Sequence, residues 1–443
     1  MFRRIATSLL ILWCACAAEA RTRPHYGGSL RIETRFDPWQ GADGVARKFT
    51  LDGLTRFDDS GVLRPALATQ WSAQNAEHRW EMRLRADVHF HDGTPLTSDI
   101  VVASLEQSCN AGCPWTTVHA VGSSIVFTSD NPVPDLPAQL ARAQFLISHR
   151  DAQGAVDGTG PFAVAGFAGG VMTLAANDDY WAGRPFVDTV EIRPKRSVRD
   201  QWLDLNIGRA DIVEVPPELL RQAQQQHLRV IQSAPVDLLA LQIARSGTLA
   251  NQKLRQAIAL AIDRSALFNV IFQKQGEVTA SLLPNEQSGY SFLFSVDRNL
   301  SRAQELRAGA TPPQLTLACE DSGADLQLAA ERIALNLREA GFRALVAPDD
   351  HSRADILLRR IHLEQPGPQS ALGEMLERFR QTPITNSEMA ALFREERDFL
   401  AQFEAVPLLY LPRAYAVGER ARDLHLAPDG SPMLEDVSLE DVK

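Results

Sequence analysis

Two histidines and an aspartate lie close together in one short segment, as His89, His91 and Asp92. Side chains two residues apart on a strand point to the same side, so both imidazoles would share a face if the segment is extended. Together with the carboxylate they could bind a metal ion or transfer protons. The segment is also typical of a strand that runs into an Asp-Gly turn. We favour the turn and predict neither a metal site nor a catalytic residue here.

Other catalytic and cofactor-binding motifs do not point to an enzyme. The sequence contains no His-Glu-x-x-His, Cys-x-x-Cys or Gly-x-Ser-x-Gly motif. Gly158-Thr159-Gly160 precedes a proline, so it matches neither a dinucleotide-binding loop nor a P-loop. A catalytic triad assembled from distant residues stays open. The expectation is a protein that has no cofactor and is not an enzyme.

The cysteines suggest one covalent cross-link. Cys109 and Cys113 flank Asn-Ala-Gly, a turn sequence that can bring the two thiols together. A disulfide is expected in an oxidising compartment, and two free thiols are the alternative. A metal site would need further ligands that are not nearby in the sequence. Cys319 belongs to an apolar run and is expected to be buried.

Periodic apolar residues predict the elements around these groups. In residues 251 to 263 apolar side chains recur every three or four positions, which predicts a buried helix ending near Asp263. Trp80, Met82 and Leu84 alternate with polar residues and predict a strand. Thr97 or Ser98 can cap a helix that follows the Asp-Gly turn.

The N-terminus and the composition predict an exported, soluble protein. Arg3 and Arg4 precede an apolar run and then Ala18-Glu19-Ala20, so residues 1–20 are typical of a signal peptide. Lipidation at Cys14 or Cys16 fits the flanking residues poorly. The net charge of −10 argues against nucleic acid and anionic lipid as partners. A chain of 443 residues is too long for one hydrophobic core, so at least two lobes are expected.

Six blocks of sequence resemble, in order and spacing, the family 5 extracellular solute-binding proteins of ABC importers. That family includes dipeptide-, oligopeptide- and nickel-binding proteins. The resemblance implies an α/β fold of the two-lobed periplasmic-binding-protein type II, in the large family 5 variety, with a discontinuous first lobe. The blocks are LDGLTRFDDSGVLRPALATQWS (51–72), FHDGTPLTSDIVVASLE (90–106), GTGPF (158–162), NDDYWAGRP (177–185), GRADIVEVPPELL (208–220) and NQKLRQAIALAID (251–263).

The resemblance divides the chain into segments. The first lobe opens at 21–48, continues through an accessory domain at 49–155 and a sheet at 156–243, and is completed at 405–443. The second lobe occupies 244–404 and is expected to be shortened. Members of the family have several tens of additional residues before the last helix of this lobe, whereas here only residues 369–385 intervene. The chain would cross between lobes near 244 and near 405, and two crossing strands provide a hinge.

The resemblance also implies a function and two ligand-binding candidates. Trp39 follows a turn that the family places at the mouth of its cleft, and Glu364 is the nearest match to the carboxylate that binds a peptide's ammonium group in relatives. The alternatives are that Trp39 packs against its own lobe and that Glu364 is an ordinary surface residue. The expected function is a monomeric periplasmic subunit that captures a peptide or similar solute and delivers it to membrane permeases. The alternatives are a nickel or metallophore carrier and a secreted hydrolase.

Overall fold

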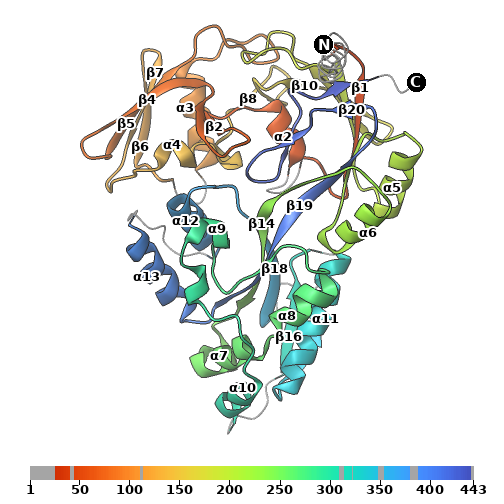
Figure 1. The fold of residues 1–443 in the computed structure, drawn as a ribbon. Coiled ribbons are helices and arrows are strands. Elements are labelled where there is room, and N and C mark those ends of the chain that lie inside the picture. The colour runs from red at the N-terminus through yellow and green to blue at the C-terminus, as the bar shows by residue number, and fades with distance from the viewer. Residues whose placement is uncertain are drawn as a thin grey trace, which may run out of the picture.

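Two long antiparallel strands run through the middle of the molecule, β14 (Val230–Ile243) and β19 (Ala405–Val417) (Figure 1). All residues of β19 except Arg413 are buried, as its nearly continuous apolar sequence predicts. This computed structural model describes residues 25–39, 44–109, 113–308, 314–321, 323–347, 354–379 and 388–440. The expected signal peptide lies outside the described residues. None of the helices in these ranges is long and apolar enough to span a bilayer.

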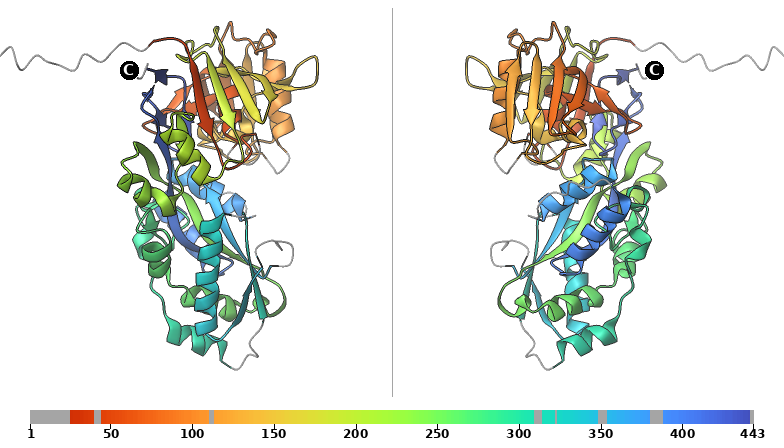
Figure 2. Two further views of the ribbon diagram at one scale, coloured as in Figure 1. Left: turned by 90° about the vertical axis from the view of Figure 1, so that its right-hand side faces the viewer. Right: turned by 90° about the vertical axis from the view of Figure 1, so that its left-hand side faces the viewer.

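The two strands join the sheets of both lobes into one. The strand order is β10-β11-β12-β1-β13-β19-β14-β18-β16-β17, and β15 also pairs with β19. The lower and upper bodies in Figure 2 are therefore connected through β14 and β19. The other strands are β1 (Ser29–Glu33), β10 (Phe162–Ala168), β11 (Val171–Ala176), β12 (Thr189–Arg193), β13 (Ile212–Glu214), β15 (Glu277–Val278), β16 (Gln314–Cys319), β17 (Arg343–Val346) and β18 (Ile356–His362).

One expectation for this sheet is wrong. The sequence predicts separate strands at 228–232 and 235–247, whereas β14 is continuous over 14 residues. Its register with β19 shifts between Gln232 and Pro235 and again between Pro235 and Asp237. Pro235 lacks a backbone N–H, and such irregular positions are where a strand can contain proline without ending.

The accessory domain has its own four-stranded antiparallel sheet, in the order β4-β5-β7-β6. Trp80, Met82 and Leu84 on β5 are buried, as their alternation predicts. Helix α3 lies beside this sheet, and the Thr97 hydroxyl accepts a hydrogen bond from Ile100 N at its start. The elements are β4 (Ala68–Gln74), β5 (Arg79–Leu84), α3 (Ser98–Ser108), β6 (Thr117–Val121), β7 (Ser124–Thr128) and α4 (Leu136–Gln139), with short pairs β2 (Thr55–Phe57) with β3 (Leu63–Pro65) and β8 (His149–Arg150) with β9 (Val156–Asp157).

Helices surround the β16–β18 part of the sheet in the second lobe. Helix α7 (Gln252–Ala261) buries Leu254, Ala257 and Ile258. It ends near Asp263, as the sequence predicts. A longer helix over 251–273, which the apolar pattern also suggested, does not form as one element, because the Asp263 side chain caps a separate short helix, α8 (Arg264–Ala266). The remaining helices are α2 (Val45–Thr50), α5 (Val198–Asn206) and α6 (Leu220–Gln225) in the first lobe, and α9 (Asn285–Ser288), α10 (Leu300–Arg307), α11 (Ala324–Glu339), α12 (Pro368–Arg378) and α13 (Met389–Leu400) in the second.

After β19, the chain ends on the first lobe. It forms two small antiparallel ribbons there, β20 (Ala421–Arg422) with β23 (Ser438–Leu439) and β21 (His425–Leu426) with β22 (Pro432–Met433). Leu424, Leu434 and Val437 from this segment are buried in the same cluster as Leu30 of β1. The C-terminal segment is thus part of the first-lobe core.

Three of the six sequence blocks, 51–72, 158–162 and 177–185, meet at one buried carboxylate, Asp52. It accepts hydrogen bonds from Thr159 Oγ1 (2.9 Å), Tyr180 OH (3.1 Å) and Trp181 Nε1 (2.8 Å). Burial raises the pKa of Asp52 to about 6, although these three hydrogen bonds lower it. The joint formed by Asp52 and its three donors connects the accessory domain to the rest of the first lobe.

The glycines of the 158–162 block have a steric role at the same joint. A Cβ on Gly158 would lie 2.1 Å from Thr50 O, and a Cβ on Gly160 would lie 2.6 Å from Thr50 C. Gly160 N also donates a hydrogen bond to Thr50 O at 3.0 Å. The two backbones can approach this closely only because neither residue has a side chain.

Candidate functional site

A small pocket of about 100 Å³ lies beside the central strands and is lined by both lobes. The first lobe contributes residues 34–38, which follow β1, and Glu214, Val215 and Pro217 at and after the end of β13. The second lobe contributes Asp321, which follows β16, and Arg360 of β18; β14 and β19 supply Asp237 and residues 412–415. The pocket thus lies near the carboxyl ends of β1, β13 and β16, the usual location of ligand sites in α/β sheets.

Arginines around this pocket are held by carboxylates. Arg413 Nε lies 3.1 Å from both carboxylate oxygens of Asp237. Burial raises the pKa of Asp237, but Arg413 and then His362 hold it well below its usual range. Arg35 Nε bonds Glu214 Oε2 at 3.0 Å. These pairs fix the pocket wall, because a paired guanidinium has a defined orientation.

Two carboxylates of the pocket, one from each lobe, are not neutralised in this way. Asp37 accepts a hydrogen bond from Trp39 N at 3.0 Å, and Asp321 accepts one from Gly323 N at 2.7 Å. Neither forms an ion pair with another described residue. Each lobe thus contributes one carboxylate that has no ion pair with a described residue, which suits an ammonium group, although Arg360, the ion-pair partner of Asp325, also interacts with Asp321 at longer range.

Trp39 lies next to this pocket but does not line it. Its side chain is half-buried against the first-lobe core cluster that contains Leu30 and Phe49. Its neighbours Phe36, Asp37 and Pro38 form the pocket wall instead. A ligand contact by Trp39 stays a prediction.

Glu364 lies in a different cavity, of about 150 Å³, between the second lobe, the accessory domain and the C-terminal segment. Its Oε2 accepts a hydrogen bond from Ala143 N at 2.7 Å, and its Oε1 lies 3.3 Å from Arg378 Nη2. Burial raises the pKa of Glu364, but Lys48 and His362 hold it below its usual range. The structure does not bring Trp39 and Glu364 into one pocket. The role of Glu364 as an ammonium-binding residue stays a prediction.

A second contact crosses between the lobes next to Glu364. Arg142 of the accessory domain is buried, and its Nη1 bonds Glu377 Oε2 of α12 at 2.9 Å. Opening the lobes on this side would therefore break the Arg142–Glu377 ion pair and the bond from Ala143 N to Glu364. We call these two interactions the interlobe contacts.

His362 is a buried cation that the sequence did not single out. Its Nδ1 lies 2.8 Å from Asp237 Oδ1. Burial and Arg413 lower the pKa of His362, but the hydrogen bond to Asp237 and the carboxylate of Asp429, 3.9 Å from Nε2, raise it to about 9. Asp429 in turn bonds Lys48 of α2. His362 therefore connects the central strands to the C-terminal segment as an imidazolium at neutral pH.

The structure places His89 and His91 in a turn. Strand β5 already ends at Leu84, and His89 makes only an isolated bridge with Pro95. Gly93 N donates to Phe90 O at 2.9 Å, which closes the Asp-Gly turn. His89 is exposed, whereas the ring of His91 lies against Asp157 and Gly160.

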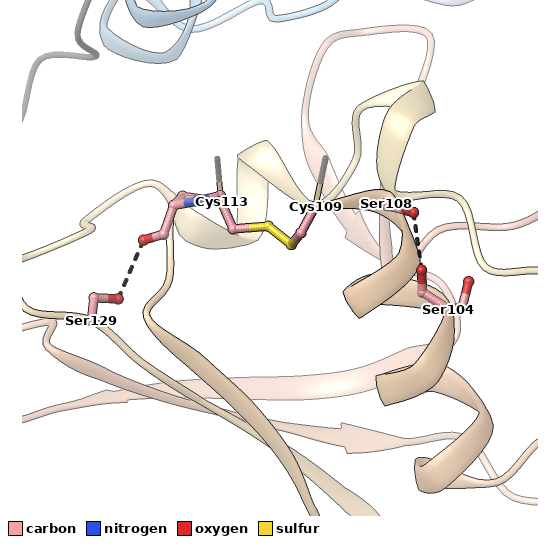
Figure 3. Close-up of a disulfide and its surroundings, with 6 residues drawn as sticks. Ser104, Ser108, Cys109, Cys113 and Ser129 are labelled. Carbon is pink, nitrogen blue, oxygen red and sulfur yellow. Dashed lines mark hydrogen bonds between the residues drawn. A yellow bond between two sulfur atoms is a disulfide. The ribbon is translucent and has the colours of Figure 1, made fainter. Parts of the chain in front are cut away.

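The structure joins Cys109 and Cys113 in a disulfide, with 5.5 Å between their Cα atoms (Figure 3). Cys109 directly follows α3, where the Ser108 hydroxyl donates to Ser104 O at 3.0 Å. Beyond Cys113, the Ser129 hydroxyl donates to Pro114 O at 3.3 Å. Both cysteines lie against the accessory-domain core. Cys319 is a buried free thiol, as expected.

Comparison with known families decides what kind of scaffold this is. Residues 62–360 match the model of the bacterial extracellular solute-binding proteins, family 5 (middle region). The chain belongs to this family. The expected membership and fold class are thereby confirmed, and family 5 consists of binding proteins that lie outside the cytoplasm.

Relatives of this family 5 protein bind different solutes. The nickel-binding protein NikA of Staphylococcus aureus is 22% identical over 287 residues, covering 61% of this chain and 58% of that protein. A probable di/tripeptide-binding protein of Pseudomonas aeruginosa is 26% identical over 348 residues, covering 66% and 65%. The chain thus spans about three fifths of the length of these curated relatives.

Solved structures show the same fold at lower identity. The structure of S. aureus NikA in complex with Ni(L-His)2 has a TM-score of 0.79 at 18% identity, covering 93% of this chain and 100% of that one. The oligopeptide-binding protein AppA of Bacillus subtilis, in complex with a nonapeptide, has a TM-score of 0.79 at 17% identity, covering 95% and 100%. These likenesses establish the two-lobed fold alone.

The sequence did not reveal the charged residues of the pocket other than the turn at Phe36 to Pro38. Asp321 lies in the loop after β16, and Arg360 lies on β18. Neither position has a local sequence pattern typical of a binding site. The position after β16, where a carboxylate follows an apolar strand, is the one local signal that could have identified Asp321.

Proposed function

We propose that this family 5 protein is the periplasmic substrate-binding subunit of an ABC importer. Residues 1–20 direct its export, and the exported protein is a monomer. It captures a peptide or similar small solute between its lobes and delivers this solute to membrane permeases. The observation that carries the proposal is the pocket beside β14 and β19, where Asp37 and Asp321 present carboxylates from opposite lobes. A solute with an ammonium group can contact both carboxylates and so hold the lobes together.

Lobe closure is the mechanism that this arrangement supports. The pocket of about 100 Å³ is smaller than the roughly 300 to 1,000 Å³ of typical ligand sites, so a whole peptide enters only when the lobes separate. A solute that binds the closed form more tightly shifts the population toward it. The interlobe contacts re-form on closure and stabilise the form that docks on the permeases.

The substrate class can be tested by removing single charges. Calorimetry with trialanine and N-acetyl-trialanine compares Asp321→Asn, Glu364→Gln and the wild type. Losing one partner of a desolvated charge pair costs about 2 to 5 kcal/mol, or about 30-fold or more in Kd. We expect Asp321→Asn to weaken trialanine by this factor and to leave the acetylated peptide almost unchanged. A similar loss for Glu364→Gln would assign the ammonium contact to Glu364.

A matched control is Asp297→Asn, which removes an exposed second-lobe carboxylate outside the pocket. Small-angle scattering with and without the peptide measures closure directly. If trialanine binds without compaction, the closure mechanism is wrong. If mass spectrometry of the protein purified from its host finds no co-purifying solute and no peptide binds, the proposed peptide class is wrong.

A nickel or metallophore carrier is the second candidate within the family. Neither histidine nor cysteine occurs among the described residues that line the pocket, so a metal would bind there as a chelate with its own ligands. Nickel that co-purifies with the wild type and is lost in Asp321→Asn would favour this candidate. A secreted hydrolase predicts peptide turnover, which mass spectrometry of the incubated trialanine would detect.

A further inference from the structure

A second group of side chains with ligand chemistry lies in the accessory domain, away from the pocket. Asp92, His149 and Asp157 each place one potential ligand atom within 4.8 Å of the other two. His149 and Asp157 are opposite each other on the ribbon formed by β8 and β9, and Asp92 comes from the Asp-Gly turn. Three separate stretches of sequence are thus brought to one point.

The spacing of the three atoms suits a small cation. His149 Nε2 lies 3.2 Å from Asp92 Oδ2 and 3.8 Å from Asp157 Oδ2. Donor atoms at about 2.0 to 2.2 Å from a tetrahedral zinc ion lie about 3.3 to 3.6 Å apart. The two distances from His149 Nε2 therefore need shifts of only a few tenths of an ångström, and the two carboxylate oxygens lie within 4.8 Å of each other.

An independent observation concerns the histidine nitrogen. His149 Nε2 is enclosed and has no hydrogen-bond partner among the described residues, although Asp92 Oδ2 is near. The carboxylate is therefore within reach of the nitrogen but outside the direction of a ring N–H bond. In a neutral imidazole that is protonated on Nδ1, Nε2 instead carries a lone pair, which can bind a metal ion.

Neighbouring residues hold all three side chains in place. His91 Nδ1 lies 3.0 Å from Asp157 Oδ1, so Oδ2 is the oxygen that faces His149. Thr94 N donates to Asp92 Oδ1 at 2.8 Å, which likewise directs Oδ2 to the group. The ring of Phe90 contacts the His149 ring edge to face, with 4.3 Å between centroids. Outer interactions of this kind are typical of metal ligands.

We propose that Asp92, His149 and Asp157 bind one divalent transition-metal ion of the zinc class, with water completing its coordination. One imidazole and two carboxylates favour zinc over calcium or magnesium, which prefer oxygen ligands alone. The bound ion would connect the Asp-Gly turn to the β8–β9 ribbon, just before the glycine block at 158–162. This site is independent of the solute pocket and of the proposed transport function.

The test uses the full chain without a polyhistidine tag, stripped with EDTA and titrated calorimetrically with zinc chloride. We expect one ion per molecule for the wild type. Since replacing even an outer partner costs about 10- to 100-fold in metal affinity, His149→Ala and Asp92→Asn should each weaken binding at least about 100-fold. His119→Ala, an exposed histidine of the same domain, and Asp321→Asn in the solute pocket should leave it unchanged.

X-ray absorption at the zinc edge of the wild type keeps the proposal testable if a variant does not fold. The expected spectrum shows only nitrogen and oxygen ligands at about 2.0 to 2.2 Å, including one imidazole. A sulfur ligand, the absence of imidazole or the absence of a one-to-one site in the titration would overturn the proposal. Equal zinc affinity in His149→Ala would do the same, leaving His149 as the ion-pair partner of the two aspartates.

Discussion

Asparagine at position 52 should make the protein's stability less dependent on pH. Asp52→Asn keeps the shape of the side chain. Its oxygen can accept from Thr159 and Trp181, and its amide can donate to the Tyr180 hydroxyl, so the joint keeps all three hydrogen bonds. Protonated Asp52 offers the same pattern. Ionised Asp52 instead carries a buried negative charge that forms no ion pair with a described residue, and Arg56 stabilises it only at longer range.

The size of the effect follows from the pKa of Asp52. A folded-state value of about 6, against an ordinary 3.8, corresponds to about 3 kcal/mol. Because the folded-state pKa is the higher one, the stabilising contribution of the protonated form is complete below about pH 4 and is lost as the pH rises through about 6. The free energy of unfolding of the wild type, relative to Asp52→Asn, should therefore fall by about 3 kcal/mol between about pH 4 and pH 7.

Urea unfolding followed by tryptophan fluorescence measures this difference across the pH range. Trp181 itself bonds Asp52, so the probe reports on the joint. Asp59→Asn, an exposed aspartate a few residues away, is the control and should show no such change relative to the wild type. A difference between wild type and Asp52→Asn that stays constant from about pH 4 to pH 7 would refute the reasoning.

Three further predictions concern other features of the fold. Gly160→Ala places a Cβ 2.6 Å from Thr50 C and should lower the free energy of unfolding by about 1 to 3 kcal/mol. The control is Gly373→Ala in α12, which has open space around it and should not destabilise the protein. Equal melting temperatures of the two variants would contradict the steric argument. Alkylation of the unfolded, unreduced protein without residues 1–20 should modify only Cys319, and three modified cysteines would remove the disulfide. The folded-state pKa of His362 is raised to about 9, so the stability of the wild type relative to His362→Asn should be greatest below about pH 6. This difference in unfolding free energy should decline by about 3 kcal/mol as the pH rises through about 9. If the difference grows with pH instead, the imidazole is neutral in the folded protein.

Local periodicity was sufficient to predict many elements but not the pocket. The sequence predicts a helix at about 198–206 and a strand at 314–319, and α5 and β16 have these bounds, because each is a short run with one buried face and a clear break at both ends. The sequence predicts a break at Pro235, because a proline usually ends a strand. This prediction is wrong, and only the pairing with β19 shows that β14 continues through Pro235.

The candidate sites depended on contacts that sequence spacing does not reveal. Glu364 was identified as the nearest match to the ammonium-binding carboxylate of relatives, but its partner Ala143 lies more than two hundred positions earlier and meets it only through the packing of two lobes. Asp37 and Asp321 come together for the same reason. In the accessory domain, His91 and Asp92 were noticed as neighbours, whereas His149 and Asp157 had no local pattern that would connect them to this turn.

The position of β19 has a consequence for the order in which the protein folds. This strand lies between β13 and β14, so a segment late in the sequence pairs with two strands that come much earlier. Until residues 405–417 arrive, β13 and β14 lack the neighbour that pairs with both of them. Pairing between segments so distant in sequence is slow. A folding intermediate in which residues 405–417 are still unpaired would therefore lack the sheet that joins the two lobes, whereas the accessory-domain core, which draws its residues from 54–147, could already have formed.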